Sequence, residues 1–265
     1  MSPLEQAKEI AASLGEKGDR LEEAKNGKSN HSFFTPTLFI RIKRPHRVDI
    51  ALDPPEREKR VLSSIDENIA PRLIMFNDNG DKAEERIIGE SPKRFDEETL
   101  RKIEKPISSL HSRRFEKSFV PSLRLSHYRS RCSGIREFET SAAKRFLVEA
   151  LAEIESFPYC LSHNDLWAGN IIIGSQGARL LDFEFAGGAP SVFDWLSLIE
   201  ENDVSEDIAK RFLSSFGDGE RLYRLSFALD AIWGYWAKAR YEDEGDGEML
   251  SIEQAKIERF KRLFQ

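Results

Sequence analysis

The thirty residues from Ser162 to Ser191 constrain the fold of this chain more than any other segment. They begin with an H-x-D-x-x-x-x-N motif, which is made by His163, Asp165 and Asn170. Two short apolar runs follow, at residues 171–173 and 180–181, and a turn containing glycine separates them. Paired apolar runs around such a turn predict a buried β-hairpin. The hairpin brings Asp182, which follows its second run, close to Asn170 at its start.

This set of side chains suits phosphoryl transfer from ATP. Asp165 supplies a carboxylate beside the acceptor hydroxyl, and Asn170 and Asp182 supply oxygens that hold magnesium on the phosphates. A single Asp or Asn at a strand end more often caps a turn, so a hairpin with a polar rim is the alternative. The joint occurrence of these groups at these spacings favours the phosphotransferase interpretation.

Composition indicates a globular protein whose principal partner is not nucleic acid. Charged residues make up 32% and aromatic residues 10% of the 265 residues, as in a folded protein with a substantial core. The length allows one large domain or two lobes. A net charge of −6 at pH 7, without a long basic run, argues against nucleic-acid binding.

The sequence also disfavours membrane-spanning and disulfide-based architectures. No stretch approaches the ~20 apolar residues of a membrane span, and residues 1–15 lack the apolar core of a signal peptide. Cys132 and Cys160 are the only cysteines, and their separation suits neither a disulfide scaffold nor a metal site. We therefore expect a reduced, cytoplasmic protein without a membrane span.

The first third of the chain contains most of the strand signals. Alternation predicts a strand over Leu38–Ile42, with Arg41 on the face opposite its apolar neighbours. Pro54 and Pro55 suit the first turn of a helix over Glu56–Ile65. The other expected elements are helical segments over Glu5–Leu14 and Arg20–Ala24 and a hairpin whose strands cover Ala70–Phe76 and Glu85–Gly89.

The rest of the chain is mainly helical in pattern. A stripe of Leu100, Ile103, Ile107 and Leu110 begins after Asp96. Further helices are expected over Phe138–Ile154, Ser205–Phe216, Glu220–Tyr241 and Ile252–Phe264. The sequence therefore predicts an α+β protein with two lobes. Residues 1–89 form a small antiparallel-sheet lobe that binds nucleotide, and residues 90–265 form a larger, mainly helical lobe for catalysis and substrate binding.

Several motifs resemble those of one known family. His163-Asn-Asp-Leu-Trp-Ala-Gly-Asn-Ile is similar to the catalytic loop of the choline/ethanolamine kinase branch of the aminoglycoside phosphotransferase-like superfamily, which has a protein-kinase-like fold. Asp182-Phe-Glu-Phe resembles the metal-binding D-F-E-[YF] segment of that branch, and Phe193-Asp194 and Gly27-Lys-Ser-Asn resemble two further family motifs. The likeness runs from about Gly27 to Trp236, and it is specific only in these patches.

The resemblance assigns a role to each candidate site residue. The catalytic residue is Asp165, and the metal ligands are Asn170, Asp182 and Glu184. The nucleotide-binding residues are Ser29, Asn30, Arg41, Glu58 and Ile88. The substrate-binding residues are Glu201, Trp233 and Trp236. Two alternatives stay open: residues 27–30 also fit an ordinary turn, and Arg41 with Glu58 also fits a surface ion pair of little energetic worth.

The residues expected at the acceptor have a second interpretation. Trp233-Gly-Tyr-Trp236 resembles the W-G-x-W of choline kinases, whose indoles surround a quaternary ammonium through cation–π attraction. Both tryptophans also lie on an apolar helical stripe that is typical of a core helix. Glu200 is as good a candidate as Glu201 for the acid near the ammonium. Glu206 occupies a position where the family often has Tyr, and this extra acid favours a primary amine or another cationic alcohol.

Together these features predict an enzyme that uses ATP and Mg²⁺ to phosphorylate the hydroxyl of choline, ethanolamine or a related amino alcohol. Kinases of the same superfamily that act on aminoglycosides, thiamine or methylthioribose are the alternatives within this chemistry. A nucleotide-binding regulatory protein without catalytic activity is the alternative outside it. The expected partner is a small cationic alcohol, and a homodimer stays open.

Overall fold

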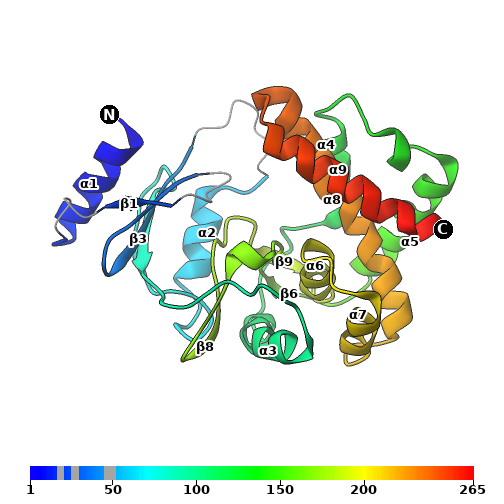
Figure 1. Cartoon of the computed structure of the whole chain (residues 1–265), viewed down its shortest axis with the longest axis horizontal. Helices are drawn as coiled ribbons and strands as arrows, with labels where there is room; N and C mark the ends of the chain where they lie inside the picture. Colours follow the sequence, from blue (N-terminus) through cyan, green and yellow to red (C-terminus); the bar gives the residue numbers. More distant parts are fainter. Residues whose placement is uncertain (17–20, 25–29, 45–51) are drawn as a thin grey trace.

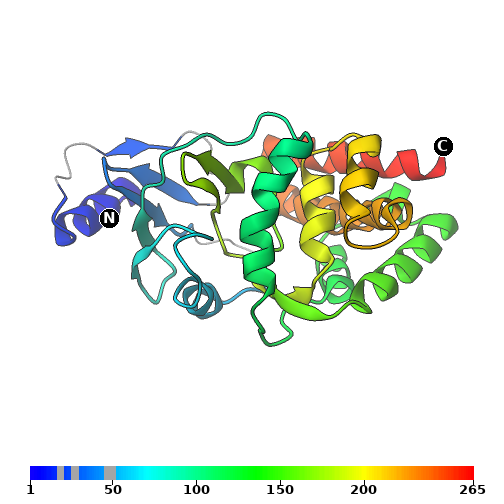
Figure 2. The same ribbon diagram turned by 90° about the horizontal axis from the view of Figure 1, so that it is seen from below.

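The computed structural model describes residues 1–16, 21–24, 30–44 and 52–265 (Figure 1). The chain forms an α+β, protein-kinase-like fold with two lobes. An antiparallel sheet lobe lies at one end of the molecule and a mainly helical lobe at the other, in both views (Figures 1 and 2). The predicted division of the chain at residues 89 and 90 stays a prediction.

The sheet lobe contains a five-stranded antiparallel sheet with the strand order β1-β2-β3-β5-β4. Its strands are β1 (Glu22–Glu23), β2 (His31–Phe34), β3 (Leu38–Ile42), β4 (Leu73–Phe76) and β5 (Lys82–Glu85). Helix α1 (Pro3–Ser13) covers the outer face, where Ala7 and Ala11 pack against Ile40 and Ile42 of β3. Because side chains alternate along a strand, Arg41 lies on the opposite face.

Two expectations for this lobe need correction. Residues 21–24 are not helical, because Glu22 and Glu23 pair with β2 as an edge strand. The second hairpin strand lies at Lys82–Glu85 and not at Glu85–Gly89, since Lys82 and Glu84 are buried charges that hide the apolar alternation. The strand over Leu38–Ile42 is confirmed, and the helix expected over Glu56–Ile65 is α2 (Pro55–Leu62), which begins one residue earlier and ends three residues earlier.

The second lobe is built around the long helix α8. Its helices are α3 (Glu97–His111), α4 (Pro121–Arg129), α5 (Ser141–Glu155), α6 (Phe193–Glu201), α7 (Glu206–Leu213), α8 (Gly219–Glu244) and α9 (Gly247–Lys261). Helix α8 packs against α4, α5, α6, α7 and α9. Short 3₁₀ turns occur at residues 136–138, 168–170 and 262–264.

Local sequence explains where these helices begin and end. The side chains of Asp96, Thr140 and Asp218 cap α3, α5 and α8 by accepting backbone N–H bonds in the first turn. Helix α8 ends at Gly245, whose φ of 70° is readily accessible to glycine. Helix α4 has no counterpart among the expected elements, because it buries Pro121, Arg124 and Tyr128 and not an apolar stripe.

Two small β-ladders lie where the lobes meet. Strand β6 (Tyr159–Ser162) pairs with β9 (Gly187–Pro190), and β7 (Ile171–Gly174) pairs with β8 (Gly177–Leu180). The second pair is the hairpin that the motif-bearing segment predicts. Its strand β7 also contacts the connector from the sheet lobe, where a Cβ at Gly89 would lie 2.7 Å from the Ile173 carbonyl oxygen. The connector therefore requires glycine at this position.

A side-chain contact also joins the lobes. Arg124 of α4 pairs through both terminal nitrogens with Asp53, in the segment that precedes α2, and both side chains are buried.

Within the described residues, no helix is long and apolar enough to cross a membrane.

Candidate active site

The fully buried carboxylate of Asp194, on the first turn of α6, fixes the backbone of the H-x-D loop. Its two oxygens accept the backbone N–H groups of His163 and Asn164, at 2.9 and 2.7 Å. His111 Nε2 lies 2.9 Å from Asp194 Oδ2. Burial opposes ionisation of Asp194, but the hydrogen bond and charge of His111 hold its pKa below the ordinary value. The carboxylate thus ties the H-x-D loop to α6.

His163 links the same loop to the strand that precedes Asp182. Its ring Nε2 lies 2.7 Å from the Leu181 carbonyl oxygen, and the ring is fully buried against Phe183. Burial lowers the pKa of His163, which favours a neutral imidazole in this position. His163 therefore holds the loop against the segment that follows the hairpin.

Asp165 and Asn170 lie at the two ends of the loop and contact each other. Asn170 Nδ2 donates to Asp165 Oδ2 at 2.8 Å and to the Asp165 backbone oxygen at 3.0 Å. Burial and the negative charges of Glu201, Asp182 and Glu184 raise the pKa of Asp165 well above its ordinary value. Such a carboxylate is a stronger base than an exposed aspartate.

Asp182 follows β8 in a left-handed backbone conformation, with φ at 54°. This conformation is uncommon outside glycine, although Asp and Asn tolerate it better than other residues. Asp182 Oδ1 accepts a hydrogen bond from Arg41 Nη1 at 2.9 Å, and 37% of the side chain is exposed. The turn therefore brings the carboxylate to the sheet lobe and leaves part of it open.

Arg41 and Glu58 form a buried, two-pronged ion pair. The Arg41 Nη2–Glu58 Oε2 distance is 2.6 Å and the Nη1–Oε1 distance is 2.9 Å. Their side chains are 1% and 2% exposed, so the surface-pair alternative is wrong. Burial opposes ionisation of Glu58, but Arg41 and Lys82 lower its pKa to about 2. Both groups are therefore charged.

The oxygen donors near Asp182 fit a magnesium ion. The Asn170 NH₂ group is taken by Asp165, so Asn170 offers its Oδ1 to a further ligand. Burial and the nearby charge of Asp182 raise the pKa of Glu184 to about 7, and a cation beside the two carboxylates would offset their repulsion. In the described part of the chain, no group of three or more His, Cys, Asp and Glu side chains is placed to hold a metal ion by itself. An open site of few oxygens suits Mg²⁺, which keeps waters and phosphate oxygens as ligands.

The predicted nucleotide-binding residues lie in different surroundings. Asn30 is buried, and its Nδ2 lies 3.4 Å from Glu184 Oε2. Ile88 lies in the connector with its side chain 75% exposed. Ser29 lies outside the described residues. The structure therefore brings Asn30, Arg41 and Glu58 to the carboxylate cluster, whereas only the backbone near Ile88 packs on the hairpin, at Gly174.

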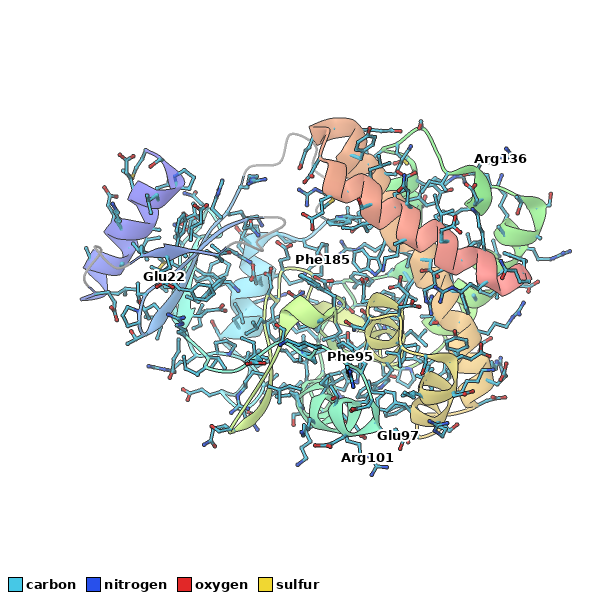
Figure 3. The ribbon with its side chains drawn as sticks, viewed as in Figure 1. Glu22, Phe95, Glu97, Arg101, Arg136 and Phe185 are labelled. Carbon is cyan, nitrogen blue, oxygen red and sulfur yellow. The ribbon has the colours of Figure 1, made fainter. Side chains whose placement is uncertain are left out.

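Three aromatic rings meet at nearly right angles beside the D-F-E segment. Phe185 lies 5.4 Å from Trp233 and 6.4 Å from Trp236, with interplanar angles of 75° and 79°, and the two indoles lie at 90°. Phe185 lies centrally, between the two lobes (Figure 3). Trp233 is buried and its Nε1 has no partner among the described groups, whereas Trp236 is partly exposed. Leu222, Leu225, Leu229 and Ile232 of the same stripe are buried. The stripe thus belongs to the core. At its end, Trp233 and Trp236 form an aromatic corner with Phe185.

Two acids at the end of α6, Glu200 and Glu201, share one lysine. Lys256 Nζ of α9 bonds Glu200 Oε1 at 2.6 Å and Glu201 Oε2 at 3.0 Å. Burial raises the pKa of both glutamates to about 7, despite the lysine. After burial, the negative charge of Glu201 contributes most to the raised pKa of Asp165. Glu206, in contrast, is exposed and pairs with Lys210, so it adds no acid to this cluster.

Sequence reasoning missed Lys82, Lys256 and His111, which support Glu58, Glu201 and Asp194. Nothing in their local sequence marks them, because each acts across a tertiary contact. Phe185 carried a signal, since it is the last residue of the quoted Asp182-Phe-Glu-Phe motif.

Comparisons with known proteins agree with this geometry. Residues 98–232, just over half of the chain, match the model of the phosphotransferase enzyme family. No curated protein matches the sequence. A choline/ethanolamine kinase family protein from Mesorhizobium loti superposes with a TM-score of 0.74 at 17% identity, over 98% of this chain and 94% of that one. Choline kinase LicA from Streptococcus pneumoniae gives a TM-score of 0.73 at 18% identity, over 97% and 98% of the two chains. The ADP-bound aminoglycoside phosphotransferase APH(2'')-Ib gives 0.62 at 17% identity, over 98% and 99%. At identities this low, the superpositions show a shared fold alone.

Proposed function

The chain belongs to the phosphotransferase enzyme family, and we propose that it uses ATP and Mg²⁺ to phosphorylate the hydroxyl of choline, ethanolamine or a related amino alcohol. One observation carries the proposal: Phe185, which meets Trp233 and Trp236 in the aromatic corner, directly follows Glu184 and belongs to the same segment as Asp182. A cation held in the corner would place its alcohol arm near Asp165.

In this proposal Asp165 is the catalytic base. The two hydrogen bonds from Asn170 fix its carboxylate, and the surrounding negative charge keeps it basic. It orients the acceptor hydroxyl and takes the hydroxyl proton as the new P–O bond forms. Asn170, Asp182 and Glu184 would hold Mg²⁺, which neutralises charge on the phosphates when it is bound.

The sheet lobe is proposed as the nucleotide-binding lobe, with residues 1–89 on one side of the division and residues 90–265 on the other. Arg41 uses its Nη atoms on Glu58, Asp182 and the Gly80 carbonyl, and its buried Nε has no acceptor among the described residues. A guanidinium has five N–H donors, so one N–H of Arg41 has no acceptor among the described residues, and we propose a phosphate oxygen as its acceptor once nucleotide is bound. The fold neighbours include LicA in complex with AMP, which supports nucleotide use.

The charge around the acceptor site favours a cation. Asp165, Glu184 and Glu201 lie together, and Lys256 offsets only part of their charge. A quaternary ammonium can lie against aromatic faces, where each contact contributes roughly 0.5–2 kcal/mol. Because Lys256 already bonds Glu201, a cationic acceptor must share that carboxylate with the lysine. A non-catalytic protein is disfavoured, since Asp165, Asn170 and Asp182 are all present and mutually positioned.

The experiment is a screen of phosphoryl transfer from ATP with Mg²⁺ to choline, ethanolamine, an aminoglycoside, thiamine and methylthioribose. Each product is detected directly by mass, and Asp165→Asn provides the inactive control. We expect choline or ethanolamine to give the highest kcat/KM. Exclusive activity on an aminoglycoside or methylthioribose contradicts the acceptor assignment, and no transfer to any acceptor contradicts the kinase assignment.

A further inference from the structure

Lys82 is a fully buried cation directly opposite Arg41. The two residues are partners in the β3–β5 register, so their side chains lie on the same face of the sheet, toward α2. Two like charges in directly opposed positions destabilise a sheet unless an anion lies between them. The strand pairing therefore creates a need for a shared carboxylate at this point.

Glu58 of α2 is that carboxylate. Its Oε1 accepts from Arg41 Nη1 at 2.9 Å and lies 3.1 Å from Lys82 Nζ, while its Oε2 accepts from Arg41 Nη2 at 2.6 Å. Lys82 Nζ also bonds Glu84 Oε1, two residues along the same strand, at 3.0 Å. Glu58 is thus held from two sides, by Arg41 on β3 and by Lys82 on β5.

The contact between Lys82 and Glu58 matters because Arg41 has more than one carboxylate within reach. Arg41 Nη1 divides its bonds between Glu58 and Asp182, at 2.9 Å each. Without Lys82, Arg41 would be the one side chain among the described residues that fixes Glu58, and the orientation of the guanidinium toward Asp182 would depend on that single pair. Burial favours the neutral amine, yet Glu58 and Glu84 raise the pKa of Lys82, so the lysine is charged.

We propose that Lys82 is a positioning residue for nucleotide binding, which fixes Glu58 and, through Glu58, the guanidinium of Arg41 beside Asp182. Glu84 is a second carboxylate partner of Lys82, beside Glu58. This inference rests on the proposed ATP-dependent function, in which Arg41 contacts phosphate oxygens.

A purely structural ion pair has a different consequence. Lys82 and Glu84 can be removed together as a neutral unit, and such a buried pair is often replaced by apolar or uncharged groups with little loss of stability. If the pair only supports the fold, K82M/E84Q changes thermal stability and leaves nucleotide affinity as it is. If Lys82 positions Arg41, nucleotide affinity falls in a protein that stays folded.

The test measures the affinity of wild type, E84Q and K82M/E84Q for a non-hydrolysable ATP analogue with Mg²⁺, by calorimetry, together with their melting temperatures. E84Q is the matched control, because it leaves Lys82 on Glu58. We expect its Kd within about twofold of wild type, and a Kd about tenfold higher for K82M/E84Q, as is usual for coupled residues in one ion-pair network.

Each outcome decides the inference. A folded K82M/E84Q protein with wild-type Kd overturns the positioning role and leaves the proposed function intact. A wild type that binds no nucleotide overturns the proposed function, and the inference with it. If K82M/E84Q does not fold, K82Q/E84Q takes its place, since its two amides can bond each other; a second failure to fold marks the pair as structural and overturns the inference.

Discussion

Asn170 donates from a single amide nitrogen to both the carboxylate Oδ2 and the backbone oxygen of Asp165, at 2.8 and 3.0 Å. The amide therefore fixes the orientation of the proposed base, and its remaining Oδ1 points to a second role as a metal ligand. Two functions in one side chain make the residue a sensitive test of the account.

We expect Asn170→Ala and Asp182→Ala both to lower Mg²⁺-dependent turnover, Asp182→Ala more severely because it removes a charged ligand and a partner of Arg41. Raising the Mg²⁺ concentration should restore part of the activity of Asn170→Ala. The measurement is kcat as a function of free Mg²⁺ for each variant. An Asp182→Ala enzyme with normal turnover at low Mg²⁺ rules out the metal assignment.

The two tryptophans should respond differently to replacement by leucine. Trp236 is partly exposed at the aromatic corner, so Trp236→Leu should raise KM for the cationic acceptor about tenfold, from a loss of ~1–2 kcal/mol of cation–π attraction. Trp233 is 4% exposed, so Trp233→Leu should mainly lower the melting temperature. KM and melting temperature are measured on both variants. Unchanged KM in both removes the amino-alcohol assignment and keeps the kinase.

The buried Glu58 should produce an acid-sensitive component of stability. Its pKa is about 2 in the folded protein, below the ordinary value of 4.5, so the unfolded chain binds the additional proton. A depressed pKa gives stability that is fully present above pH ~4.5 and is lost as the pH falls toward 2, on the order of 3 kcal/mol.

Chemical denaturation between pH 2.5 and 6, a range chosen to span roughly these two pKa values, tests the Glu58 prediction. Glu58→Gln should unfold more easily at neutral pH and should lack this part of the acid dependence. Parallel pH curves for wild type and Glu58→Gln exclude Glu58 as the source. E84Q is a suitable control, because burial raises the pKa of Glu84 and does not lower it.

Sequence reasoning succeeded where the signal is local. The β7–β8 hairpin follows from two apolar runs around a turn, and the start of α2 follows from Pro54 and Pro55. The stripe from Leu100 to Leu110 is buried as its spacing predicts. These features depend on neighbours within a few residues, so pattern and turn chemistry suffice.

It failed where distant residues change what a side chain can tolerate. Lys82 and Glu84 do not resemble a buried strand. The ion pairs of Lys82 with Glu84 and with Glu58, which another element contributes, compensate for the burial of the lysine. Helix α4 lacks an apolar stripe, because one of its buried side chains is Arg124, which is paired with Asp53. The sequence suggested that Glu201 faces the acceptor, but its bond with Lys256 is a tertiary contact with a residue of α9 that no local pattern predicts. The proposed roles of these site residues stay predictions.

The most direct test of the central claim is Asp165→Asn. The amide keeps the shape of the side chain but does not accept the hydroxyl proton, so the loss should appear in kcat. Single-turnover phosphoryl transfer and nucleotide affinity are measured on the same preparation. We predict that kcat falls by about 10²-fold or more while the Kd for the ATP analogue stays within about threefold, since Asp165 does not contact Arg41 or Glu58. Turnover within about tenfold of wild type contradicts the assignment of Asp165 as the catalytic base.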